Sequence, residues 1–139
     1  MNLNNIVLTN NFELVLKVEY EKFPGIQAAK LGKLEYFHKC PSTVKVHNDD
    51  GLTPLHIAAA RGDIELVKTL LSLKAPINVP DNDGNTPLHM ASVFYHPLVI
   101  MILLNAGANP VVQNINKQNY TEILDYKRLT YSFLRIKKN

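Results

Sequence analysis

The chain has almost no cysteine: its 139 residues include a single one, Cys40. No disulfide can form within the chain, which excludes a small secreted scaffold held together by disulfide bridges. No run of about 18 apolar residues offers a candidate transmembrane helix. The first residues also lack the basic segment that opens a secretory signal peptide. We therefore expect a cytoplasmic or nuclear protein, and a protein delivered into a host cell would share these features.

The motifs of common catalytic sites are absent as well. The sequence contains no glycine-rich phosphate loop, no nucleophile elbow and no paired-carboxylate motif. Cys40 follows Lys39, but no nucleophile signature surrounds it, so we interpret it as a buried or semi-buried thiol. We therefore expect no enzymatic activity, no metal ion, no cofactor and no small-molecule substrate.

Charge is scarce and unevenly placed. Charged residues make up 19% of the chain and apolar residues 46%, which is typical of one folded domain and excludes a disordered chain. Residues 1–118 hold ten basic and ten acidic side chains, whereas residues 119–139 hold five and two. This last part therefore carries the whole net charge of +3. A role in binding nucleic acid or an anionic membrane would have to rest on it.

What the sequence does contain is an internal repeat. Thr53-Pro-Leu-His-Ile-Ala58 returns as Thr86-Pro-Leu-His-Met-Ala91, at an offset of 33 residues. A fixed period of this size indicates a stack of similar units, each too small to bury its own apolar face. The two copies, residues 51–71 and 84–104, resemble the ankyrin repeat. The resemblance implies an all-α solenoid of paired antiparallel helices with β-hairpin or turn tips, and a function in protein binding.

The residue types within the first copy fit a pair of helices. Thr53 is a good helix N-cap, and Pro54 suits the first helical position, where a missing N–H costs nothing. Gly62 suits the left-handed residue that ends a helix, which predicts a first helix over residues 53–61. Asp63 is an N-cap for a second, amphipathic helix, whose apolar positions are Ile64, Leu66, Val67, Leu70 and Leu71.

Weaker copies flank the two clear ones. Residues 23–35 match residues 53–65 at an offset of 30 and keep the Pro, Ala-Ala and Gly positions. Downstream, we align residues 119–123 with residues 84–88, which puts Glu122 in the place of Pro87. Clusters of turn residues at 48–51 and 81–85 separate the units.

The chain is therefore interpreted as one domain with five parts. These are an N-terminal extension or cap (1–22), a degenerate first repeat (23–50), two repeats (51–83 and 84–118), and a degenerate C-terminal cap with a basic tail (119–139). Residues 12–20 alternate like a half-buried strand, whereas Leu16, Glu19 and Tyr20 can share a helical face. We favour the helix, because a lone strand has no partner edge in a helical solenoid.

His56 and His89 occupy equivalent positions in the two clear copies. The resemblance implies that each imidazole bonds to loop backbone and ties a loop to a helix. A catalytic or metal-binding role would need convergent Cys, His or carboxylate partners, which the spacing does not supply. We therefore interpret both histidines as structural.

The resemblance also implies that a partner protein binds a concave surface built from the loop tips and the first helices. The positions that vary most freely in such units, our candidate binding residues, are Asp49, Asp50, Leu52, Arg61, Asn82, Asp83, Asn85, Val93, Phe94 and Tyr95. The acidic tips suggest a basic segment on that partner. A module of this kind would hold or mask its partner, as a small inhibitor, an adaptor or a host-directed effector.

The second clear copy departs from the first at the end of its first helix. Phe94 and Tyr95 align with Arg61 and Gly62. If the backbone of Tyr95 has a positive φ, the bulky side chain costs about 1 kcal/mol or more, and such strain tends to lie at functional positions. Two interpretations stay open: the aromatic rings cover a neighbouring repeat, or they anchor a partner protein.

The second helix of this copy has an apolar outward face. Leu98, Met101 and Ile102 align with Glu65, Lys68 and Thr69. We expect another part of the chain to cover this face. The candidates are residues 1–22 or Leu129, Phe133 and Leu134 of the tail, and the alternative is a contact with a partner or a second copy.

The basic tail is predicted to form a capping helix with a solvated basic face. A nuclear import signal, an anionic-membrane contact and phosphate binding remain alternatives. We expect a monomer and keep a dimer open.

Overall fold

The computed structural model describes residues 22–137, with side chains placed up to residue 130. Its helices are α3 (Pro24–Lys30), α4 (Leu34–Lys39), α5 (Pro54–Arg61), α6 (Ile64–Ser72), α7 (Pro87–Val93), α8 (Pro97–Asn105) and α9 (Tyr120–Lys137), with a short 3₁₀-helix η1 at Pro41–Lys45. The described residues contain no strand, and the predicted all-α class is confirmed. The helix expected within residues 1–22 lies outside the described residues, apart from Lys22.

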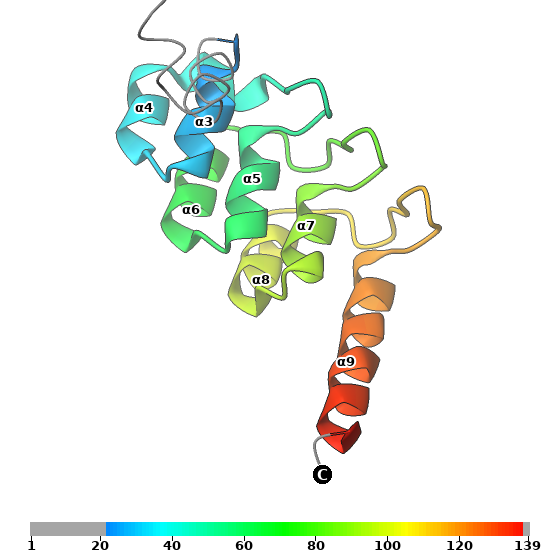
Figure 1. Ribbon diagram of the computed structural model, residues 1–139. Helices are drawn as coiled ribbons and strands as arrows, with labels where there is room; N and C mark the ends of the chain where they lie inside the picture. Colours follow the sequence, from blue (N-terminus) through cyan, green and yellow to red (C-terminus); the bar gives the residue numbers. More distant parts are fainter. Residues whose placement is uncertain (1–21, 138–139) are drawn as a thin grey trace, which may run out of the picture.

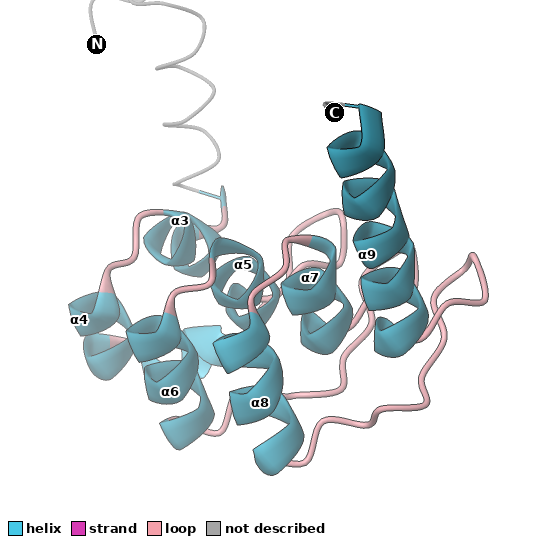
Figure 2. Ribbon diagram, turned by 90° about the horizontal axis from the view of Figure 1, so that it is seen from below, coloured by secondary structure: helices cyan, strands magenta, loops and turns pink. Residues whose placement is uncertain are grey.

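The helices form pairs that stack in one direction (Figure 1). Helix α3 packs on α4, α5 on α6, and α7 on α8. Helix α5 also contacts α3 and α7, and α7 contacts α9, so that these four helices form one layer. Helices α4, α6 and α8 form the second layer, as Figure 2 shows from a perpendicular direction. The pairs therefore form a two-layer solenoid, and the connections between successive pairs project on one side of it.

The predicted start and end signals of α5 and α6 are confirmed. The Thr53 hydroxyl accepts a bond from the backbone N–H of His56 at 3.4 Å, and Pro54 is the first helical residue. Gly62 ends α5 with a φ of 68°. The carboxylate of Asp63 then accepts from the N–H of Leu66 at 3.1 Å and begins α6. The start and end of α5 and the start of α6 thus follow from Thr53, Pro54, Gly62 and Asp63.

The core lies between the two layers of helices. Five alanines of the inner helices are fully buried, because small side chains let neighbouring helices approach closely: Ala28, Ala29, Ala58, Ala59 and Ala91. Larger apolar side chains fill the space around them, and the largest that are fully buried are Phe37, Leu55, Leu66, Leu70, Leu88 and Leu103. Leu70 and Leu103 are 33 residues apart, so the core repeats with the sequence.

The first helix pair is a shortened version of those that follow. Pro24 begins α3, and Gly32 has a φ of 67°, like Gly62 thirty residues later. Helix α4 has 6 residues, whereas α6 and α8 have 9 each. The 3₁₀-helix η1 follows α4 and buries Val44 against the core.

The alignment of residues 119–123 with residues 84–88 is wrong by two residues. Lys117, with a φ of 60°, occupies the place of Gly84, which has a φ of 75°. Asn119 is the N-cap: its side chain accepts from the N–H of Glu122 at 3.1 Å, and Glu122 accepts from the N–H of Asn119 at 2.7 Å. Glu122 therefore stands where the earlier units have histidine, and the period of 33 continues into α9.

Candidate functional site

Three loops repeat the same turn and form a row of fingers along one side of the stack. We call them the first (48–52), second (81–85) and third (114–118) fingers. In each one the first residue bonds to the last through the backbone, at 3.0, 2.8 and 3.0 Å. The side-chain oxygen of that first residue, Asn48, Asp81 or Asn114, accepts two further backbone N–H groups of its own loop. These bonds give the fingers a defined shape without a sheet.

Neighbouring fingers are also bonded to each other. The backbone N–H of Asn82 donates to the carbonyl of Asp50 at 2.9 Å, and that of Ile115 donates to the carbonyl of Asp83 at 2.9 Å. The Asn82 side chain adds a bond to the carbonyl of Asp49 at 2.8 Å. The fingers therefore form a connected row that is rigid before any partner binds.

The two repeat histidines tie the inner helices to this row. The Nε2 of His56 donates to the carbonyl of Asn85 at 2.8 Å, and the Nε2 of His89 donates to the carbonyl of Gln118 at 2.9 Å. On the other side of each ring, Nδ1 accepts the N–H of Thr53 or Thr86. Both rings are buried. Each histidine therefore holds the finger of the following unit, and all its ring nitrogens have structural partners.

Burial of the ring lowers the pKa of His56 from its ordinary value of 6.5. Removal from water penalises the charged imidazole, and this effect outweighs the bond to the Asn85 carbonyl, which favours the charged form. His56 is therefore neutral near pH 7. This state suits an N–H donor on one side of the ring and an acceptor on the other.

Several predicted binding residues on the fingers serve the scaffold as well. Asn82 holds the first finger, and the Asn85 side chain accepts a bond from Asn114 at 3.1 Å. Leu52 is partly buried against the core. Asp50 and Asp83, in contrast, have exposed side chains at successive tips. The fingers thus expose the carboxylates of Asp50 and Asp83, while Asn82, Asn85 and the first residue of each finger hold the loops in shape.

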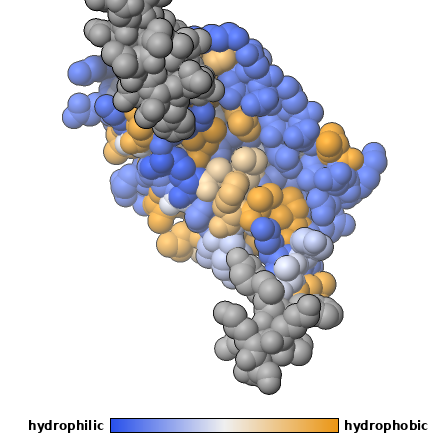
Figure 3. Space-filling model, viewed as in Figure 1, coloured by the Kyte–Doolittle hydropathy of each residue, from blue (hydrophilic) through white to orange (hydrophobic). Residues whose placement is uncertain are grey.

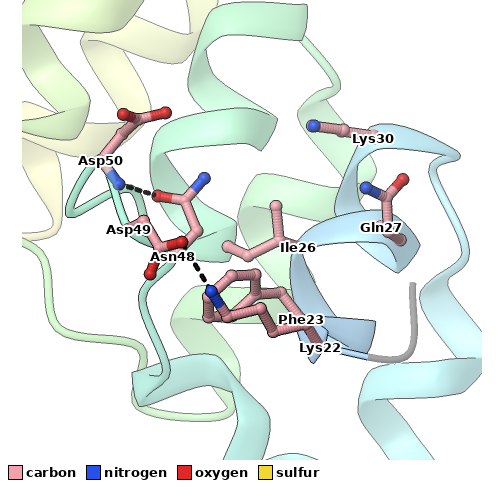
Figure 4. A pocket seen from close by; sticks show the side chains of 8 residues that line it. All are labelled: Lys22, Phe23, Ile26, Gln27, Lys30, Asn48, Asp49 and Asp50. Carbon is pink, nitrogen blue, oxygen red and sulfur yellow. Dashed lines mark hydrogen bonds and ion pairs between the residues drawn. The ribbon is translucent and has the colours of Figure 1, made fainter. Parts of the chain in front are cut away.

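A groove of about 290 Å³ lies between α3 and the first finger. Figure 4 shows Asn48 and Lys30 extending into it from opposite sides, with Ile26 and Phe23 between them. Lys22 bonds to Asp49 across its rim at 2.7 Å and lies 5.0 Å from the centre of the Phe23 ring. This groove combines an apolar floor with charged groups of both signs.

Phe94 and Tyr95 lie at the end of α7 that is remote from the fingers. Their exposed fractions are 55% and 60%, although both are large apolar side chains. Tyr95 has a φ of 56°, so the backbone at the position of Gly62 is left-handed and the condition for strain at this bulky residue is met. The alternative that the two rings cover a neighbouring repeat fails, because more than half of each remains exposed.

The C-terminal ends of α5 and α3 are held by side chains of the following unit, a role that the sequence did not indicate for either side chain. His96 donates from Nε2 to the carbonyl of Ala60 at 2.9 Å, across the interface between two units. In the preceding unit, Arg61 donates to the equivalent carbonyl of Lys30. A side chain from the next unit therefore caps both α3 and α5. The position of Arg61, taken from the sequence as a binding residue, is structural in this respect.

Among the described residues, nothing covers the apolar face of α8. Leu98 and Met101 are each 58% exposed, whereas Ile102 is partly buried against the core. The expectation that Leu129 packs on this face is wrong, since Leu129 is itself 62% exposed. Phe133, Leu134 and residues 1–21, the other candidates for covering it, have no described side chains.

The face with the fingers is mixed in character. Figure 3 shows hydrophobic residues gathered near its centre, next to a broad hydrophilic area. Among the described residues, no group of three or more His, Cys, Asp or Glu side chains could hold a metal ion. No described helix is long and apolar enough to cross a membrane.

Paired helices in two layers, with a bonded row of loops at one edge, define a helical repeat protein. A family model of ankyrin repeats, in three copies, matches residues 26–114. The chain therefore belongs to the ankyrin repeat family. Ankyrin repeats are in general protein-interaction modules, and the family is typically non-enzymatic.

Proposed function

We propose that this chain binds a partner protein through its finger row and inner helices, and that it acts by holding or masking that partner without catalysis. The proposal extends to its setting: a small inhibitor or adaptor in the cytoplasm or nucleus, or an effector in a host cell.

The frame of the surface supports binding without rearrangement. Backbone bonds join the fingers, and His56 and His89 fasten two of them to the helices. A surface that is already ordered loses little conformational entropy on association, so more of the contact energy appears as affinity. Specificity must then come from the side chains that the frame displays.

The exposure of Phe94 and Tyr95 is the observation that carries the proposal. Two adjacent aromatic side chains stand on a left-handed turn, where the preceding unit has Gly62. A non-glycine residue at such a φ costs about 1 kcal/mol, and the fold gains nothing visible from it. Exposed aromatic anchors on rigid turns are the residues that dominate protein interfaces.

The fingers complement these anchors with charge. Asp50 and Asp83 are equivalent positions on neighbouring tips, and both are exposed. The partner segment that follows the tips is therefore proposed to be basic, with an apolar part that reaches Phe94 and Tyr95. The partner is proposed to be a protein, because ankyrin repeats are in general protein-interaction modules.

The test is capture of the partner from extracts of the native cell by the immobilised chain, read by mass spectrometry. Phe94→Ala with Tyr95→Ala is expected to reduce capture at least about tenfold, since each anchor contributes roughly 2 kcal/mol or more. Leu98→Ala with Met101→Ala is the matched control, because it removes an equally exposed apolar pair from the outer layer. Full capture by the Phe94 and Tyr95 variant would remove both residues from the site.

The exposed face of α8 supports a second function, self-association. Leu98 and Met101 expose more than half of their surface on the outer layer, with Ile102 beside them. Leu98→Glu with Met101→Lys restores the residues of the preceding unit and is expected to abolish a dimer of this kind. Sedimentation equilibrium measures the oligomeric state, and a wild-type monomer at high micromolar concentration would rule out self-association.

A further inference from the structure

Helix α9 is much longer than the inner helices before it. It has 18 residues, whereas α7 has 7 and α5 has 8. Counted from the N-caps Asn119 and Thr86, Tyr126 is the equivalent of Val93, where α7 ends. Residues 127–137 therefore extend past the end of α7 by about 16 Å at 1.5 Å per residue. We call this part of α9 the overhang, and Figures 1 and 2 show it projecting from the stack.

Exposed apolar side chains lie at the root of the overhang. Tyr126 is 66% exposed and Leu129 is 62% exposed. They are three residues apart, so they share one face of the helix. Tyr126 also continues the row of equivalent inner-helix positions Ala60 and Val93.

The charge of the overhang has a single sign. Residues 127–137 contain Lys127, Arg128, Arg135 and Lys137 and no acidic residue. The two acidic residues of α9, Glu122 and Asp125, lie in the part before it, and Glu122 bonds at the helix N-terminus. The overhang therefore differs from every other described helix, because an exposed apolar pair lies at the start of a segment whose four charged residues are all basic.

We infer that the overhang binds an acidic amphipathic helix of a partner protein. The apolar stripe of such a helix would cover Tyr126 and Leu129, in the helix-on-helix mode that uses anchors at i, i+3 and i+4. Its acidic flanks would be attracted by the net positive charge of the overhang. A second copy of this chain would instead bring four basic residues against four, which opposes that occupant.

A nucleic acid or a membrane matches these features of the overhang less well. A nucleic acid supplies negative charge but no apolar stripe for Tyr126 and Leu129. An anionic membrane supplies both, but it favours a helix with one continuous face free to lie in the interface. The first two turns of α9 are packed on α7, and they carry Glu122 and Asp125.

The experiment measures binding of synthetic probes to the full chain by fluorescence anisotropy. The first probe is an amphipathic helix of 18 residues, the length of α9, with Leu on one face and Glu elsewhere. Its twin carries Lys in place of Glu, and a third probe has the acidic composition in scrambled order. We expect the acidic helix to bind at least about tenfold more tightly than either, since charge and the apolar stripe are both needed.

Variants locate the probe on the chain. Tyr126→Ser with Leu129→Ser should weaken the acidic helix at least about tenfold, whereas the matched control Leu98→Ser with Met101→Ser should leave it unchanged. All four side chains are more than half exposed, so folding is expected to survive and is checked by circular dichroism. Phe94→Ala with Tyr95→Ala should also leave the probe bound, which separates this inference from the proposed function.

Each contrary outcome overturns the inference. Equal binding of the acidic helix and its scrambled form would reduce the overhang to a non-specific basic segment. Binding unaffected by the Tyr126 and Leu129 variant would place the probe elsewhere. A dimer that this variant dissociates would make the second copy the occupant. Binding to vesicles of phosphatidylcholine and phosphatidylserine, lost in the same variant and without peptide binding, would make it a membrane.

Discussion

The units at 51–83 and 84–118 have the same scaffold and different surfaces. Both have a Thr-Pro start, a buried histidine bonded to the next finger, and the same alternation of buried and exposed positions in the outer helix. They differ where Arg61 and Gly62 become Phe94 and Tyr95, and where Glu65 and Lys68 become Leu98 and Met101. The residues shared by the two units explain the fold, and the residues that differ are those for which we propose a role in binding.

The largest effect is expected where the two units agree. Leu70→Ala and Leu103→Ala each empty a fully buried, equivalent position, and each should lower the free energy of unfolding by about 2–5 kcal/mol. Urea denaturation of the two variants measures both losses. A large loss at one position and none at the other would show that the scaffolds are not equivalent.

A smaller loss is expected for Gly62→Ala. Gly62 has a φ of 68°, and an added Cβ would lie 2.4 Å from Nδ1 of His96. The substitution strains the backbone and displaces the ring that caps Ala60, so it should cost about 2 kcal/mol. Thermal or urea unfolding measures the loss, with Ala60→Ser as a control that leaves the turn intact. An unchanged stability would mean that the His96 ring moves away freely.

The reverse change should have the opposite sign. Tyr95→Gly removes a large side chain from a residue with a φ of 56° and should stabilise the fold by about 0.5–1 kcal/mol. The same variant should lose partner capture if Tyr95 is an anchor. A gain in stability with intact capture would make Tyr95 dispensable for binding, and a loss of stability would assign the ring a structural role.

The smallest effect is a pH dependence that arises from His56. Because burial lowers the pKa of His56, the unfolded chain takes up a proton near pH 6.5 while the folded chain does so only at lower pH. The free energy of unfolding should therefore decrease as the pH falls below about 6.5, and the contribution is fully present above that value. Urea denaturation at about pH 7.5 and about pH 5.5 measures it. His56→Gln should be less stable throughout but should show a shallower decrease, and an equal decrease would contradict the assignment.

The sequence was most informative where one residue type has one physical role. The N-caps Thr53 and Asp63 and the glycine at 62 could be predicted, because each depends on local backbone geometry. The sequence raised a positive φ at Tyr95 only as a condition, which the structure meets. The alignment of residues 119–123 with residues 84–88 was two residues off, because Lys117 adopts a backbone conformation that is typical of glycine.

Contacts between units could not be predicted from the sequence. Nothing local marks His96 as the residue that caps Ala60, since the bond joins positions 36 residues apart and needs the space above Gly62. Nothing local marks the role of Asn82 either: the sequence predicts a variable binding residue, whereas its side chain holds the first finger in place. Candidate binding residues chosen by position thus include residues that maintain the frame, such as Asn82 and Arg61, although both are exposed.

His56 and His89 each bond to a residue 29 positions later in the chain, which affects folding during synthesis. The Nε2 of His56 bonds to the carbonyl of Asn85 and that of His89 to the carbonyl of Gln118, so each histidine needs the finger that follows its own helix pair. A chain emerging from the ribosome can form the helices of a unit early, but its imidazole stays open to water until about 29 further residues have appeared. At roughly 5–20 residues per second this delay lasts seconds. The N-terminal units would therefore mature one step behind elongation, and hydrogen exchange on stalled nascent chains would show their protection rising in that order.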